Sequence, residues 1–80
     1  MILTLYGVKD ELADRFLNPV LMNSEAEAKR QFKSQINTLP IWKDNSGDFS
    51  LWRLGTFDDQ NGLLLADPEK LINGRSVRDA

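Results

Sequence analysis

The feature that most constrains the fold is a single capped and amphipathic helix near the middle of an 80-residue chain. Asn23 and Ser24 supply a helix cap, and Glu27 follows Ser24 at the spacing of a capping box. Glu25 and Glu27 also bring negative charge to the positive end of the helix dipole. These signals predict a helix over residues 24–37.

The apolar residues of this predicted helix recur at the spacing of one helix face. They are Ala28, Phe32, Ile36 and Leu39. Such a stripe has to be covered by other apolar residues, and the segments on both sides of the helix have the composition of β-strands. The stripe is therefore predicted to pack on a sheet.

Before the helix, residues 2–8 are rich in β-branched and aromatic side chains and are apolar on both faces, which predicts a central strand. Residues 9–15 are rich in charge and fit either a helical turn or a hairpin loop. Residues 19–22 predict a short strand at an edge of the sheet, because Pro19 has no backbone N–H to donate.

After the helix, residues 38–48 have a loop composition, and residues 48–57 alternate as one long strand. The cluster at residues 58–62 ends in Asn-Gly, which favours a tight turn. Residues 63–65 then return as the partner strand. The second half of the chain is therefore predicted to contain a β-hairpin.

The end of the chain carries one more local signal. Residues 67–70 begin with an Asp-Pro pair that is typical of a helix start, and Gly74 fits the stop of a short helical turn. Residues 1–74 are therefore predicted to form one domain, and residues 75–80 a flexible C-terminal tail.

Together these elements predict an α+β fold, in which a small, mainly antiparallel four-stranded sheet in β-β-α-β-β order carries the helix on one face. One helix leaves the other face uncovered. Tyr6, Trp52 and Leu54 are predicted to lie on that face and to form the interface of a homodimer. The chain begins directly with a strand-like run and has no stretch of membrane-spanning length, so a cytoplasmic protein without membrane contact is expected.

The chain contains no cysteine and no histidine, which excludes several chemistries. A disulfide, a thiol nucleophile, a Cys/His zinc site and a histidine base all lack their residues. Carboxylates gather at Asp10, Glu11 and Asp14 and again at Asp58 and Asp59, but neither group has the spacing of a calcium loop. We predict no catalytic residue, no metal ligand and no cofactor; a divalent ion held between Asp10 and Asp14 would instead indicate a small enzyme.

Charge is uneven along the chain, although the net charge is only −2. Residues 28–56 carry five basic and two acidic groups, and both flanking segments are acidic. Basic side chains hold phosphates and tryptophan rings stack on unpaired bases, so this middle segment is a candidate nucleic-acid site. The candidates are Lys29, Arg30, Lys33 and Arg53 for phosphates and Trp42 and Trp52 for bases. The alternative is a solvated helix face with Trp52 in the core, which the pI of about 4.9 favours.

One run of sequence points to a known family. It is Asp-Phe-Ser-Leu-Trp-Arg-Leu-Gly-Thr-Phe-Asp at residues 48–58, followed by the turn glycine Gly62. With the weaker runs at residues 5–10, 28–32 and 68–74, it resembles the small nonstructural protein of gokushovirus-type microviruses, which are tailless bacteriophages with circular single-stranded DNA.

The resemblance implies a non-catalytic accessory protein in the cytoplasm of an infected bacterium. It further implies binding to single-stranded DNA, or to phage replication or packaging proteins, during genome synthesis or packaging. A protein adaptor that binds a phage or host protein without touching nucleic acid is the alternative. An exposed strand edge at residues 19–22 would favour it, because such edges recruit extended segments.

Overall fold

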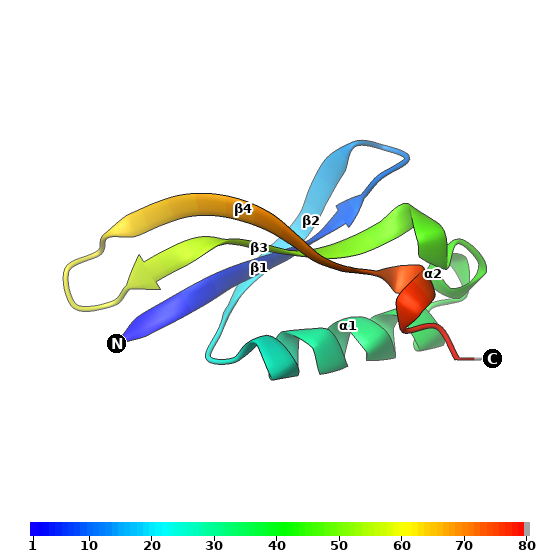
Figure 1. Ribbon diagram of the computed structural model, residues 1–80, viewed down its shortest axis with the longest axis horizontal. Coiled ribbons are helices and arrows are strands. Elements are labelled where there is room, and N and C mark those ends of the chain that lie inside the picture. The colour runs from blue at the N-terminus through cyan, green and yellow to red at the C-terminus, as the bar shows by residue number, and fades with distance from the viewer. Residues whose placement is uncertain (80) are drawn as a thin grey trace.

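The computed structural model describes residues 1–79 and contains one four-stranded antiparallel sheet with one main helix (Figure 1). The elements are β1 (Ile2–Asp10), β2 (Arg15–Met22), α1 (Glu25–Thr38), α2 (Pro40–Asp44), a 3₁₀ turn η1 (Ser46–Asp48), β3 (Phe49–Asp58), β4 (Leu64–Asn73) and a second 3₁₀ turn η2 (Gly74–Ser76). The strand order is β2-β1-β3-β4. The predicted α+β class and the central position of the first strand are confirmed. Within residues 1–79, no helix is long and apolar enough to cross a membrane.

Helix α1 begins as the sequence predicts. Ser24 is the cap, and its Oγ accepts a hydrogen bond from the Glu27 N–H at 3.1 Å. Three residues of the predicted stripe, Ala28, Phe32 and Ile36, are buried against the sheet. Leu39 is not, because the chain leaves the helix there with extended backbone and 43% of Leu39 stays exposed. The prediction that Leu39 extends the stripe is wrong.

The segment after α1 is more ordered than a loop. Pro40 opens the short helix α2, where its fixed φ and missing N–H suit the first helical position. The η1 turn follows and leads into β3. The predicted loop over residues 38–48 is therefore wrong for most of its length. A proline breaks a helix from inside, but at the first helical position, where Pro40 lies, it favours the helix.

Strand β2 confirms the predicted edge strand but starts earlier, at Arg15. Residues 11–14 form a turn, so the alternative of a hairpin loop is the correct one. The pairing of β1 with β2 shifts between Tyr6 and Val8, and Asn18 has a positive φ of 38°. Pro19 has no N–H to donate. Because β2 is an edge strand and is bulged at this point, no hydrogen bond in the interior of the sheet is lost.

The helical turn predicted for residues 67–70 is wrong, because these residues belong to the continuous strand β4. β4 is the other edge of the sheet, and its pairing with β3 shifts at two places. Edge position and bulges together tolerate Pro68. Gly74 does not stop a helix but begins η2, where a Cβ atom would overlap the carbonyl oxygen of Ser46.

Residues 75–79, which the sequence assigns to a tail, lie against the domain. Val77 packs on the core, and its carbonyl oxygen accepts a hydrogen bond from Asn37 Nδ2 at 3.0 Å. The Asp79 N–H donates to Asn37 Oδ1 at 2.6 Å. Ala80, the last residue of the predicted tail, lies outside the described residues.

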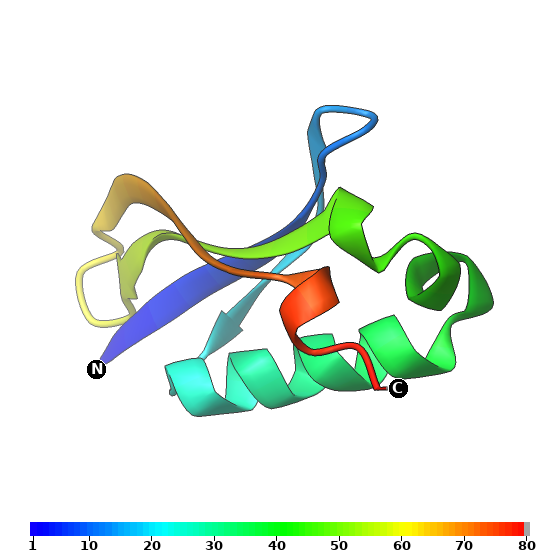
Figure 2. The same cartoon turned by 45° about the vertical axis from the view of Figure 1, so that its right-hand side comes forward.

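The core lies between α1 and one face of the sheet, while the opposite face has no helix over it (Figure 2). Its buried apolar residues are Tyr6, Ala28, Phe32, Ile36, Phe49 and Leu51. Tyr6 is only 4% exposed, so its prediction as a dimer contact on the uncovered face is wrong. The alternation of β1 was identified correctly, but Tyr6 and Val8 point toward α1, which leaves Leu5, Gly7 and Lys9 for the other side.

Candidate functional site

The uncovered side of the sheet, which we call the open face, is apolar at one end. Residues that pair directly across neighbouring strands share a face, and Leu5 pairs with Leu21 while Leu3 pairs with Phe57. The apolar end consists of Leu3, Leu5, Leu21, Leu54, Phe57 and Leu64. Two of these side chains are well exposed, Leu21 at 44% and Leu64 at 63%.

The other end of the open face carries an aromatic and cationic cluster, formed by Lys9, Phe16, Trp52 and Lys70. The Phe16 and Trp52 rings are perpendicular, with centroids 5.4 Å apart. Lys9 Nζ lies 5.4 Å from the Trp52 centroid and 5.7 Å from the Phe16 centroid. Lys70 pairs with Trp52 in the β3–β4 ladder. Gly7 lies opposite Trp52 on β1, and a Cβ there would come within 2.9 Å of Leu54 Cδ1.

Hydrogen bonds fix the Trp52 ring in this cluster. Its Nε1–H donates to Ser50 Oγ at 2.9 Å, and the Ser50 hydroxyl donates to Glu11 Oε1 at 3.0 Å. The second carboxylate oxygen of Glu11 lies 3.8 Å from Lys70 Nζ. Lys9 has its own partner, Asp14, at 3.2 Å. The indole is therefore held in one orientation.

The structure does not bring the two predicted stacking residues together. Trp42 comes from α2 and stacks almost parallel on Phe49, with ring centroids 4.5 Å apart. Phe49 belongs to the core beneath α1, so Trp42 lies on the helix side of the sheet. Trp52 lies on the open face. No single surface contains both rings.

The predicted phosphate contacts are also on the helix side, and most have carboxylate partners. Lys29 pairs with Glu25 at 3.0 Å, Lys33 lies 4.0 Å from Asp79, and Arg53 pairs with Glu69. Arg53 stands opposite Tyr6 in the ladder and so shares the helix side. Arg30 is exposed and has no ion pair within residues 1–79.

Three members of the cluster, Lys9, Phe16 and Lys70, were not predicted from the sequence. The alternation of β1 is a signal for Lys9, since it shares a face with Leu5 and Gly7. Phe16 and Lys70 gave no such signal, because their strands were predicted too short to include them.

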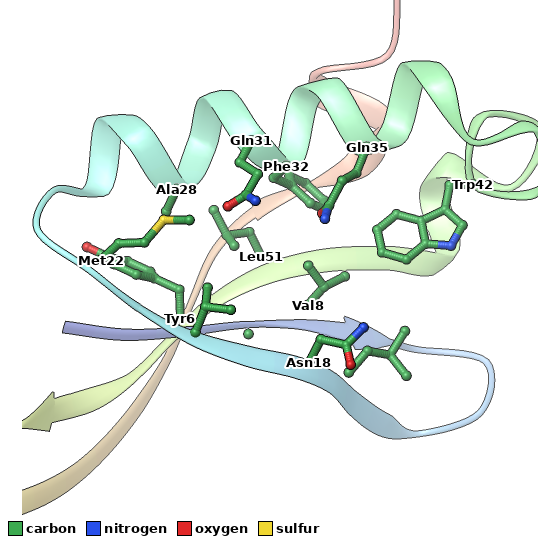
Figure 3. A pocket seen from close by; sticks show the side chains of 13 residues that line it. Tyr6, Val8, Asn18, Met22, Ala28, Gln31, Phe32, Gln35, Trp42 and Leu51 are labelled. Carbon is green, nitrogen blue, oxygen red and sulfur yellow. The ribbon is translucent and has the colours of Figure 1, made fainter.

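A pocket of about 90 Å³ opens on the helix side, between α1, β1 and β2 (Figure 3). Its walls are mostly apolar and include Tyr6, Val8, Met22, Phe32 and Trp42. The polar side chains of Asn18, Gln31 and Gln35 also line it. Over the same described part of the chain, no three carboxylates gather as ligands for a metal ion.

Residues 3–77 match the family model described as Phage ORF5 protein. The chain belongs to the Phage ORF5 protein family. It is therefore a phage protein, as the resemblance to a phage family predicts. No curated protein and no solved structure matches the chain.

The match covers β2, β3 and β4 of this Phage ORF5 protein and all of β1 except Ile2, so both the open face and the pocket are built from residues of the family region. The open face offers aromatic rings next to ammonium groups. Rings bind other flat groups by stacking, and ammonium groups bind anions. The pocket offers an uncharged, apolar space with carboxamides around it.

Proposed function

We propose that this phage protein is a non-catalytic accessory protein of a gokushovirus-type microvirus, and that it binds single-stranded DNA on the open face during genome synthesis or packaging. The observation that carries the proposal is the position of Lys9 next to the Trp52 and Phe16 rings on a sheet face that no helix covers. Unpaired bases stack on aromatic residues of such sheets, and nearby cations hold the backbone.

The charges of the cluster suit weak and salt-sensitive binding. Lys9 and Lys70 each have an acidic neighbour, but Asp14 is 84% exposed at its side chain and Glu11 is 35% exposed. The Lys9 side chain is 22% exposed and the Lys70 side chain is 44% exposed, so each pair is partly open to water. Solvent-accessible ion pairs contribute about 1 kcal/mol or less, so phosphates can compete for both lysines. With two cations available, the salt dependence corresponds to about two phosphate contacts. Paired bases in a duplex do not expose their flat faces, so a single strand is preferred.

The apolar end of the open face supports the predicted homodimer as part of this proposal. Small domains bury little of their surface, and contiguous exposed apolar patches mark interaction sites. A second copy seated on Leu21, Leu54 and Leu64 would cover the apolar end. The cluster at the other end of the face would then remain open to DNA.

Recruitment of an extended protein segment to β2, which the adaptor alternative needs, has less support. Pro19 removes one donor from that edge, and the bulge at Asn18 twists it. Prolines and bulges are devices that protect sheet edges from strand addition. A partner captured from infected cells that survives nuclease treatment, together with no oligonucleotide binding, would favour the adaptor instead.

Fluorescence anisotropy with a labelled single-stranded oligonucleotide tests the proposal. We expect binding that weakens with added salt and that exceeds binding to a duplex of the same sequence. The double variant Lys9→Gln and Lys70→Gln should weaken binding by about tenfold at low salt. The matched control, Lys29→Gln with Lys33→Gln on the helix side, should change it little. Absence of binding at low salt would overturn the proposal.

A further inference from the structure

The pocket between α1 and the β1–β2 edge has no role in the proposed contacts of the open face. Figure 3 shows its side chains converging from α1 above and from the two strands below. Its volume of about 90 Å³ is several times the roughly 10–15 Å³ that a cavity needs to hold one water molecule. The pocket therefore has room for a small flat ring that enters from solvent.

The lining of this pocket contains no charged residue. Trp42 forms one end, and its ring is held by the parallel contact with Phe49. Tyr6, Phe32 and Leu51 provide a buried apolar floor. An uncharged space with a fixed aromatic wall favours a neutral, flat ligand over a phosphate or an ion.

Three carboxamides give the pocket its polar groups. Gln31 and Gln35 come from successive turns of α1, and Asn18 comes from the opposite side, on β2 (Figure 3). None of the three side chains makes a hydrogen bond to another group within residues 1–79. A carboxamide offers a donor and an acceptor side by side, which is the pattern that pairs with the edge of a nucleobase.

Three basic residues without acidic partners are close in sequence to residues that line the pocket. Arg15 precedes the lining residue Leu17 by two positions, and Arg30 and Lys43 are direct neighbours of Gln31 and Trp42. None of these three cations forms an ion pair within the described residues, unlike the lysines of the helix side. In the described part of the chain, no carboxylate competes with a phosphate for these three side chains.

We infer that the pocket between α1 and β2 receives one unpaired nucleobase of a bound DNA strand, with the carboxamides of Gln31 and Gln35 reading its edge. This inference rests on the proposed binding of single-stranded DNA. Phe16 and Leu17 are adjacent on the edge strand β2 but face opposite sides of the sheet. A strand of DNA that crosses this edge reaches the open face and the pocket together.

The two tryptophans allow the two sites to be observed separately. In Trp52→Phe, the remaining Trp42 reports on the pocket, and in Trp42→Phe, the remaining Trp52 reports on the open face. We expect single-stranded oligonucleotides to change the fluorescence of both variants. An abasic oligonucleotide, which keeps the phosphates and sugars, should leave Trp42 unchanged.

The carboxamide role is tested with Gln31→Met and Gln35→Met, which keep the side-chain length and remove the hydrogen bonds. We expect different affinities for dA, dC and dT oligonucleotides in the natural protein, and loss of that preference by about tenfold in the double variant. Gln60→Met, in the β3–β4 turn, is the matched control. Urea unfolding of each variant verifies that the fold is retained.

The outcomes separate this inference from the proposed function. A response of Trp52 without any response of Trp42 overturns the pocket assignment and leaves the open-face proposal intact. No response in either variant and no anisotropy change overturn both. A base preference that survives the double variant, or binding that becomes tighter in it, indicates an apolar occupant and also overturns the inference.

Discussion

The indole N–H of Trp52 donates to the hydroxyl of Ser50 at 2.9 Å, two residues earlier on the same strand, although Ser50 itself has no exposed surface. The Ser50 hydroxyl in turn donates a hydrogen bond to the carboxylate of Glu11, which lies in the turn between β1 and β2. The largest ring of the open face is thus fixed by a polar group buried beneath it. Stability and the proposed binding surface depend on the same serine.

Replacing Ser50 with alanine should lower the free energy of unfolding by about 1–3 kcal/mol, because the partly buried indole N–H and the Glu11 carboxylate both lose a partner. The variant should also bind single-stranded oligonucleotides less tightly, since the Trp52 ring is no longer held. Urea unfolding and anisotropy measure the two effects. Ser76→Ala, at an exposed position in η2, is the control, and equal stability of the two variants would contradict the prediction.

Gly55 is required by the close approach of β3 and β4. A Cβ atom at this position would overlap the carbonyl oxygen of Leu65 in the neighbouring strand, so Gly55→Ala should destabilise the protein by about 3 kcal/mol or more. At Gly62 the φ is +74° but the space around it is open. Gly62→Ala should therefore cost only about 1–2 kcal/mol. Thermal unfolding of the pair gives the comparison, and a smaller loss at Gly55 would refute it.

The buried stripe of α1 gives a second matched pair. Phe32 is 1% exposed, so Phe32→Ala should cost about 3–5 kcal/mol, enough to unfold much of a domain this small. Leu39→Ala at the exposed end of the helix should change stability by about 0.5 kcal/mol or less. Circular dichroism during urea titration measures both. A large loss of stability in Leu39→Ala would show that Leu39 packs with the three buried residues of the stripe.

The sequence predicts α1 well because its signals are local: a cap, an acidic first turn and three buried residues at helical spacing. It fails at β4 because the Asp-Pro-Glu-Lys segment has the local chemistry of a helix start, while the pairing that makes it a strand comes from β3, more than ten residues away. The bulges in the β3–β4 pairing allow Pro68 to lie in a strand, and nothing in the local sequence predicts these bulges.

The sequence does not show which of the predicted site residues share a surface. Aromatic and basic residues in the middle of the chain predict a surface for nucleic acid, and that function stays a prediction. Distance along the sequence does not show which rings lie on the same face of the sheet. Helix α2 carries Trp42 to one side of the sheet, and the alternation of β3 places Trp52 on the other. Phe16 joins Trp52 only because β2 continues past the bulge at Pro19.

The homodimer proposed for the open face can be tested at its edge. Leu21 is 44% exposed and lies beside Leu5 at the apolar end of that face, so Leu21→Lys leaves the core of the single chain untouched. The substitution would force a charge into the interface between two copies, where desolvation without a partner is costly. Sedimentation equilibrium should therefore find a dimer for the natural protein and a monomer for the variant. Ile41→Lys, on α2 and 72% exposed, should remain a dimer. A natural protein that stays monomeric at high concentration, or a Leu21→Lys variant that still dimerises, would mean that copies of this chain do not meet on the apolar end.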